Sequence, residues 1–124
     1  MAISTTVTDR HLDVLALTET WHHTSDDLPI RRCVPPGYAI VDAPRRSATV
    51  GRGGGVALLY SKRFTAKRFT FAVEPTTFEA LGCMLQSPSS SAIYVVIYRP
   101  GSAAVTELFF EELTSLLEAV VTYR

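Results

Sequence analysis

Glu19 is the first residue of this chain whose type and position suggest chemistry, because it follows directly on an apolar run at residues 13–18. A carboxylate at the end of a buried strand lies where α/β proteins often place ligand-binding groups. Carboxylate oxygens are also the ligands that Mg²⁺ prefers. Because one glutamate seldom holds such an ion alone, a surface glutamate at the end of a strand remains the alternative interpretation of Glu19.

Tyr98 and Arg99 stand at the end of a second apolar run, residues 93–98. A phenol and a guanidinium at this place are suited to holding a phosphate oxygen. The alternative is a tyrosine at a strand edge that packs part of its ring and leaves its hydroxyl in water.

A glycine-rich run at residues 51–55 is accompanied by Arg45, Arg46 and Arg52. A dinucleotide-binding loop follows a strand and opens a helix, whereas this run precedes an apolar segment that has the pattern of a strand. The run therefore predicts a tight turn rather than a phosphate loop. These three arginines, and Arg99, are weak candidates for contacts with the backbone of a nucleic acid.

The charge of the chain is zero overall but unevenly distributed. Residues 31–68 hold nine Lys and Arg and a single acid, Asp42, while the segments on either side each carry a net charge of −4. Such a basic centre is suited to meeting the phosphates of DNA. An ordinary solvated face with solubility charges is the other interpretation.

Several classes of protein are excluded by composition. Cys33 and Cys83 are too few and too far apart for a disulfide scaffold or a cysteine zinc module. The three histidines match no metal-binding spacing with them, and the chain has no Gly-x-Ser-x-Gly nucleophile motif. It also has neither an apolar run of membrane-spanning length nor a secretory signal at its N-terminus. We therefore expect an intracellular protein without a membrane partner, and the nucleus is a candidate compartment.

The elements that must position these residues are mostly strands. Short apolar or alternating runs predict strands at 13–18, 38–42, 56–60, 64–71, 78–85 and 92–98. The run at 13–18 is continuous, which predicts burial on both faces. In the run at 64–71 the candidate inward positions are Phe64, Ala66, Phe69 and Phe71. The order predicts one α/β or α+β layered domain with an antiparallel meander in its middle.

A change of period near residue 103 predicts a helix that continues to about residue 123. Eight apolar residues recur at helical spacing and predict one buried face. They are Val105, Leu108, Phe109, Leu113, Leu116, Leu117, Val120 and Val121.

Four stretches of the chain resemble the endonuclease/exonuclease/phosphatase superfamily, and the likeness is closest to the endonuclease domain of non-LTR retrotransposons. The stretch Asp-Val-Leu-Ala-Leu-Thr-Glu-Thr-Trp at 13–21 looks like its glutamate motif. Gly-Tyr at 37–38, Arg-Gly-Gly-Gly-Val-Ala-Leu-Leu-Tyr at 52–60 and Ile-Tyr-Arg-Pro at 97–100 agree in order and rough spacing. The helix after residue 106 also resembles the one that follows the Tyr-x-Pro strand.

The resemblance implies an α-β-β-α layered sandwich with a divalent-metal site at one end. It implies that Glu19 binds the metal, expected to be Mg²⁺, and that Tyr98 lines the active site beside the scissile phosphate. It also implies DNA as the partner and metal-assisted hydrolysis of phosphodiester bonds as the reaction.

Several residues and motifs of the superfamily are missing from this sequence. It contains no Asn, no Gly-Asp-x-Asn motif and no Asp-His pair. We therefore expect residues 1–124 to form a single incomplete domain that lacks the first strand and the C-terminal half, with little catalysis of its own. We also expect self-association through uncovered surfaces, either the apolar stripe of the final helix or the face of residues 56–60. A non-catalytic nucleic-acid-binding fragment that uses the basic segment 31–68 is the alternative, and an unrelated small α/β protein is a third.

Overall fold

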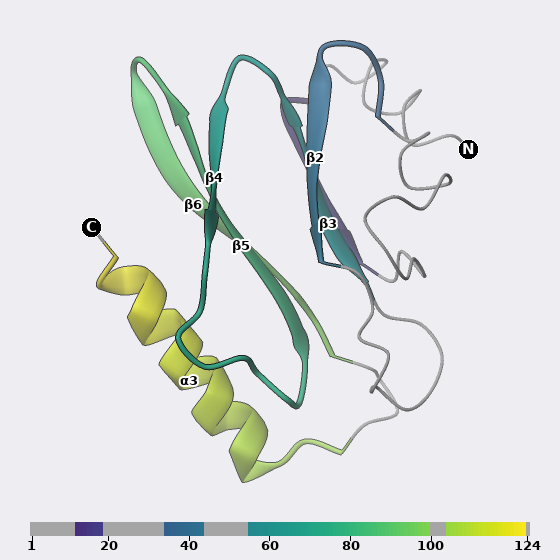
Figure 1. The fold of residues 1–124 in the computed structure, drawn as a ribbon. Helices are drawn as coiled ribbons and strands as arrows, with labels where there is room; N and C mark the ends of the chain where they lie inside the picture. Colours follow the sequence, from purple (N-terminus) through teal and green to yellow (C-terminus); the bar gives the residue numbers. More distant parts are fainter. Residues whose placement is uncertain (1–11, 19–33, 44–54, 100–103, 124) are drawn as a thin grey trace.

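A computed structural model of the chain describes residues 12–18, 34–43, 55–99 and 104–123 (Figure 1). The strands in these ranges follow the predicted order, and none of their boundaries shifts by more than two residues. They are β1 (Val14–Thr18), β2 (Tyr38–Ala43), β3 (Val56–Ser61), β4 (Thr65–Phe69), β5 (Glu79–Ser87) and β6 (Ser90–Tyr98). The helix α3 spans Glu107–Val121, three residues or more shorter at its start than the sequence predicts.

The first sheet pairs its strands antiparallel in the order β1-β3-β2. The central strand β3 is buried on both faces, since Val56, Ala57, Leu58 and Leu59 are at most 1% exposed. The prediction that β1 is buried on both faces is wrong, because β1 lies at the edge of this sheet and is half-buried to exposed. The expectation of an uncovered face at residues 56–60 is wrong as well, because Val56 and Leu58 pack in the core against residues of β5 and β6.

The second sheet is the predicted antiparallel meander, β4-β5-β6. Its central strand β5 carries a glycine in mid-strand, Gly82, opposite Phe69 of β4. A Cβ atom at residue 82 would lie 3.0 Å from the Cβ of Phe69 and 3.1 Å from the Cζ of Phe71. The absence of a side chain at Gly82 therefore lets these two rings lie over the sheet.

The two sheets stack on each other, and their facing side chains form the core (Figure 1). The cluster joins residues of β3 with residues of β5 and β6, namely Val56, Leu58, Leu81, Cys83, Leu85 and Val96. Phe64 and Ala66 pack against it as predicted. Phe69 and Phe71 do not share that face, because Phe69 contacts Tyr123 beyond the helix and Phe71 lies beside Phe69. The strand β4 therefore contributes to both sides of its sheet.

The helix α3 covers the outer side of the β4-β5-β6 sheet (Figure 1). It begins after Thr106, whose hydroxyl accepts a hydrogen bond from the N–H of Phe109 at 3.2 Å, as an N-cap should. Phe109 packs edge-on against Phe78, and Leu116 is buried. The predicted eight-residue face is too wide, because Val105, Leu108, Leu117 and Val121 are exposed. One sheet covers only one side of a helix, so the flanks remain open.

The described residues thus form an α+β fold that is mostly strand: two small antiparallel three-stranded sheets and a C-terminal helix. Among these residues, no helix has the length and apolar character needed to cross a membrane.

Candidate functional site

The ends of four strands meet at one end of the stacked sheets, which we call the Tyr98 end and define by Thr18, Gly55, Val56, Glu79 and Tyr98. The last residue of β1, Thr18, lies opposite Val56 at the start of β3. The first residue of β5, Glu79, lies opposite Tyr98 at the end of β6. The strand ends that carry the two predicted motifs are therefore at the same end of the fold.

A buried hydrogen bond joins the two sheets at the Tyr98 end. The N–H of Gly55 donates to Oε1 of Glu79 at 2.6 Å, and the Glu79 residue is 8% exposed. Gly55 has a φ of 87°, a left-handed conformation that glycine adopts without a steric cost. A charge-assisted bond in a buried place is strong, so this contact holds the start of β3 against the start of β5.

Tyr98 and Arg99 point to opposite sides of their sheet. Tyr98 packs against the core between the sheets. The guanidinium of Arg99 lies over the ring of Phe109 in α3, 5.6 Å from its centroid, which is a cation–π distance. Tyr98 therefore lies on the inner side of its sheet, whereas Arg99 lies on the helix side. The predicted contact of Arg99 with nucleic acid stays a prediction.

The other predicted site residues lie outside the described residues. These are the metal-binding candidate Glu19 and the arginines Arg45, Arg46 and Arg52. Thr18, the residue before Glu19, and Gly55, which ends the glycine-rich run, are described and belong to the Tyr98 end.

The described residues alone do not fit a divalent cation. They contain no group of three His, Cys, Asp or Glu side chains that could hold one. The carboxylate that does lie at the Tyr98 end, Glu79, already accepts the N–H of Gly55. A metal at this end would therefore need ligands from outside the described residues, among which Glu19 is the predicted one.

Glu79 is a residue of this site that the sequence analysis missed. The sequence does mark this residue, because Glu79 is the single charged residue in the apolar run 78–85. A charge at such a position is kept in a fold only when it is paired or hydrogen-bonded, and the N–H of Gly55 satisfies it here.

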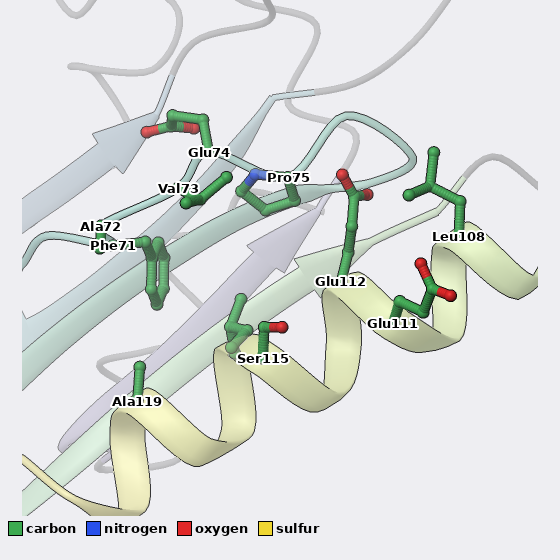
Figure 2. A pocket seen from close by; sticks show the side chains of 11 residues that line it. Phe71, Ala72, Val73, Glu74, Pro75, Leu108, Glu111, Glu112, Ser115 and Ala119 are labelled. Atoms are coloured by element: carbon green, nitrogen blue, oxygen red, sulfur yellow. The ribbon is translucent and has the colours of Figure 1, made fainter.

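A groove of about 350 Å³ lies elsewhere, between α3 and the segment that follows β4 (Figure 2). Its walls are mainly apolar, and Glu74 and Glu111 stand exposed at its rim. None of the predicted site residues lines it. Because two carboxylates at the rim repel an anion, the groove is unsuited to a phosphate substrate.

Glu112, on the same side of the helix, anchors α3 to this segment (Figure 2). Its carboxylate accepts hydrogen bonds from the backbone N–H and the hydroxyl of both Thr76 and Thr77, at 2.6 to 3.0 Å. Burial opposes the charge, but these donors outweigh it and lower the pKa of Glu112 from 4.5 to about 2. Glu112 is therefore a structural anchor rather than an acid or base for chemistry near neutral pH.

Cys83 is a core residue and not a nucleophile. It is fully buried, and burial raises the pKa of its thiol. A buried protonated thiol is unreactive.

The α+β fold and the Tyr98 end define a small two-sheet protein with a candidate polar site at its strand ends. Comparison with models of protein families finds no match to this chain, and comparisons with curated proteins and with solved structures find none either.

Proposed function

We propose that this chain is part of a metal-dependent DNA endonuclease domain of the endonuclease/exonuclease/phosphatase type, of the kind found in non-LTR retrotransposons. The proposal starts from the four motifs that occur in order along the sequence. It includes the α-β-β-α layering of that superfamily, to which the two stacked sheets and α3 would contribute three layers.

One observation of the fold carries the proposal: the strands that carry the glutamate motif and the Tyr-x-Pro motif, β1 and β6, end at the same end of the two sheets. Three contacts connect the two strand ends. Thr18 pairs with Val56, the neighbouring Gly55 donates a hydrogen bond to Glu79, and Glu79 pairs with Tyr98. These motifs lie about eighty residues apart in sequence. A shared active site requires the strand ends that carry them to lie at one end of the fold, and β1 and β6 meet this requirement.

The proposed roles follow from the chemistry of the side chains. Glu19 would bind Mg²⁺, which when bound supplies a polarised water and neutralises charge on the phosphate. The Tyr98 hydroxyl would donate a hydrogen bond to a phosphate oxygen. Arg45, Arg46 and Arg52 would bind the DNA backbone and fix its position.

We further propose that these 124 residues do little catalysis alone. The superfamily's asparagines, aspartates and histidine base have no counterpart in the motifs present. Each such group contributes orders of magnitude in rate, and their effects are strongly interdependent. The alternative function, non-catalytic binding of nucleic acid through the basic segment 31–68, would need none of them.

Metal binding tests the proposal without requiring catalysis. We would titrate Mn²⁺ into the protein and follow the paramagnetic broadening of backbone amide signals by NMR. We expect the strongest broadening at Gly55, Glu79 and Tyr98, and its loss in Glu19→Ala. Asp13→Asn is the matched control, because it removes a carboxylate just before the start of β1 and should leave the broadening unchanged.

Broadening that is absent from the Tyr98 end, or that survives Glu19→Ala, would refute the metal site and leave the binding function as the better proposal. A plasmid-nicking assay with Mg²⁺ then tests the expected low activity. Nicking by the chain that is lost in Glu19→Ala would support the endonuclease function but overturn the inference that the chain is catalytically incomplete.

A further inference from the structure

The strand β6 is an edge strand whose first half is open to solvent. It pairs with β5 on one side, and no strand in the described part of the chain pairs with its other side. Ser90, Ser91 and Ala92 are exposed, and Tyr94 is 37% exposed. An exposed edge of this kind presents N–H and C=O groups that can pair with another strand.

This edge lacks the features that normally prevent such pairing. At nine residues β6 is as long as the central strand β5, and it contains neither a charged residue nor a proline. The opposite edge of the same sheet differs, because β4 carries Lys67 and Arg68, both exposed. Lysine and arginine on an edge strand oppose pairing with a like strand, so β4 is protected and β6 is not.

An apolar flank of α3 lies on the same side as the β6 edge. Phe110, Leu117 and Val121 are 57%, 48% and 83% exposed, and their spacing places them on one stripe of the helix. The opposite flank of the helix faces the segment after β4 across the groove. Because the order of the sheet is β4-β5-β6, the stripe of Phe110 faces the β6 side.

We propose that this surface, the outer edge of β6 with the Phe110 stripe, binds a second copy of the chain. Two β6 strands would pair antiparallel about a twofold axis perpendicular to the sheet and form one continuous six-stranded sheet. Both helices would then lie on the same face, with their Phe110 stripes opposed. A twofold axis brings side chains near their own copies, so the partner must be self-complementary in charge. The uncharged β6 meets this condition, whereas the basic β4 does not.

Sedimentation velocity over a range of concentrations tests the proposal, with paired variants as controls. We expect a monomer–dimer equilibrium that Ser91→Lys weakens at least about tenfold, because a lysine on an edge strand opposes pairing with another strand. Ser89→Lys adds the same charge in the exposed turn between β5 and β6 and should leave the dimer intact. A melting curve of each variant shows that it remains folded.

A second pair of variants tests the Phe110 stripe by comparing two leucines of α3 that are equally exposed. Leu117 and Leu108 are each 48% exposed but lie on opposite flanks of α3. Leu117→Glu should weaken the dimer at least about tenfold, and Leu108→Glu should not. A monomer at all concentrations would overturn the proposal. A dimer that is insensitive to both Ser91→Lys and Leu117→Glu would overturn it as well.

Discussion

Glu112 shows how much one side chain can contribute to the arrangement of this fold. Four donors of Thr76 and Thr77 converge on its carboxylate. They tie α3 to the segment between β4 and β5. The interaction also explains why this segment, which has no regular secondary structure, holds a defined position beside the helix.

We predict that Glu112→Gln lowers the free energy of unfolding by about 1–2 kcal/mol, because the amide loses the charge and one acceptor oxygen. The partial exposure of the site keeps the loss in this range. Chemical denaturation at pH 7 measures it. Glu111→Gln is the matched control, since Glu111 is the exposed neighbour at the groove rim, and it should change stability little. Equal losses in the two variants would contradict the anchoring role.

The same carboxylate predicts a pH dependence. Its pKa is lowered from 4.5 to about 2 in the folded protein, so folding favours the charged form. The stabilisation is therefore complete above pH 4.5 and is lost as the pH falls from 4.5 toward 2. Denaturation of wild type and Glu112→Gln across this range should show their difference shrink with falling pH. A difference that is constant from pH 7 to pH 2 would show that the charge is not its source.

At the scale of elements, the meander β4-β5-β6 depends on a close approach at Gly82. We predict that Gly82→Ala destabilises the protein by about 1–3 kcal/mol, because Phe69 and Phe71 would have to shift by a few tenths of an ångström to admit the new methyl group. Thermal or chemical unfolding measures the loss.

Gly37 provides a control with a different physical cause. Its φ is +87° and nothing lies within 4 Å of where a Cβ would be, so Gly37→Ala costs only the backbone strain, about 1–2 kcal/mol. Asparagine tolerates this conformation, and Gly37→Asn should recover part of the loss. Gly82→Asn should instead be worse than Gly82→Ala. Recovery by asparagine at both positions would refute the steric explanation at Gly82.

At the scale of the whole molecule, the basic centre predicts binding to DNA. Among its described residues, Arg63 forms an ion pair with Asp13 at 2.9 Å, and Arg68 donates to the carbonyl oxygen of Asp42 at 2.8 Å. Contacts with phosphates are therefore expected to come mainly from the other basic residues of the segment. We predict that replacing Arg45, Arg46 and Arg52 together with Ala weakens the binding of duplex DNA.

The salt dependence of that affinity is the decisive measurement. The slope of log K against log salt should become shallower by about 0.9 for each DNA phosphate that the variant no longer neutralises. Arg63→Ala is the control and should leave the slope nearly unchanged, since this guanidinium already pairs with Asp13. A triple variant with the slope of wild type would exclude these arginines from the interface.

The local sequence pattern was sufficient to predict the strands and the helix of this protein. Each predicted strand and the final helix exists, because apolar runs bounded by Gly, Pro and Ser, and a change to helical period, are properties of neighbouring residues. The convergence of the two motif-bearing strand ends was expected only from the resemblance. It depends on strand pairs and on the Gly55–Glu79 bond between residues 24 positions apart.

Tertiary structure alone decided which strand is central, which faces are covered and which edges stay open. The runs at 13–18 and 56–60 are both continuous and apolar, yet β3 is buried on both faces and β1 lies at an edge. Likewise, the anchoring role of Glu112 and the exposure of Leu117 follow from where α3 lies on the sheet. Periodicity along the chain indicates which face of an element is apolar, but pairing and burial also depend on neighbours distant in sequence, which it does not identify.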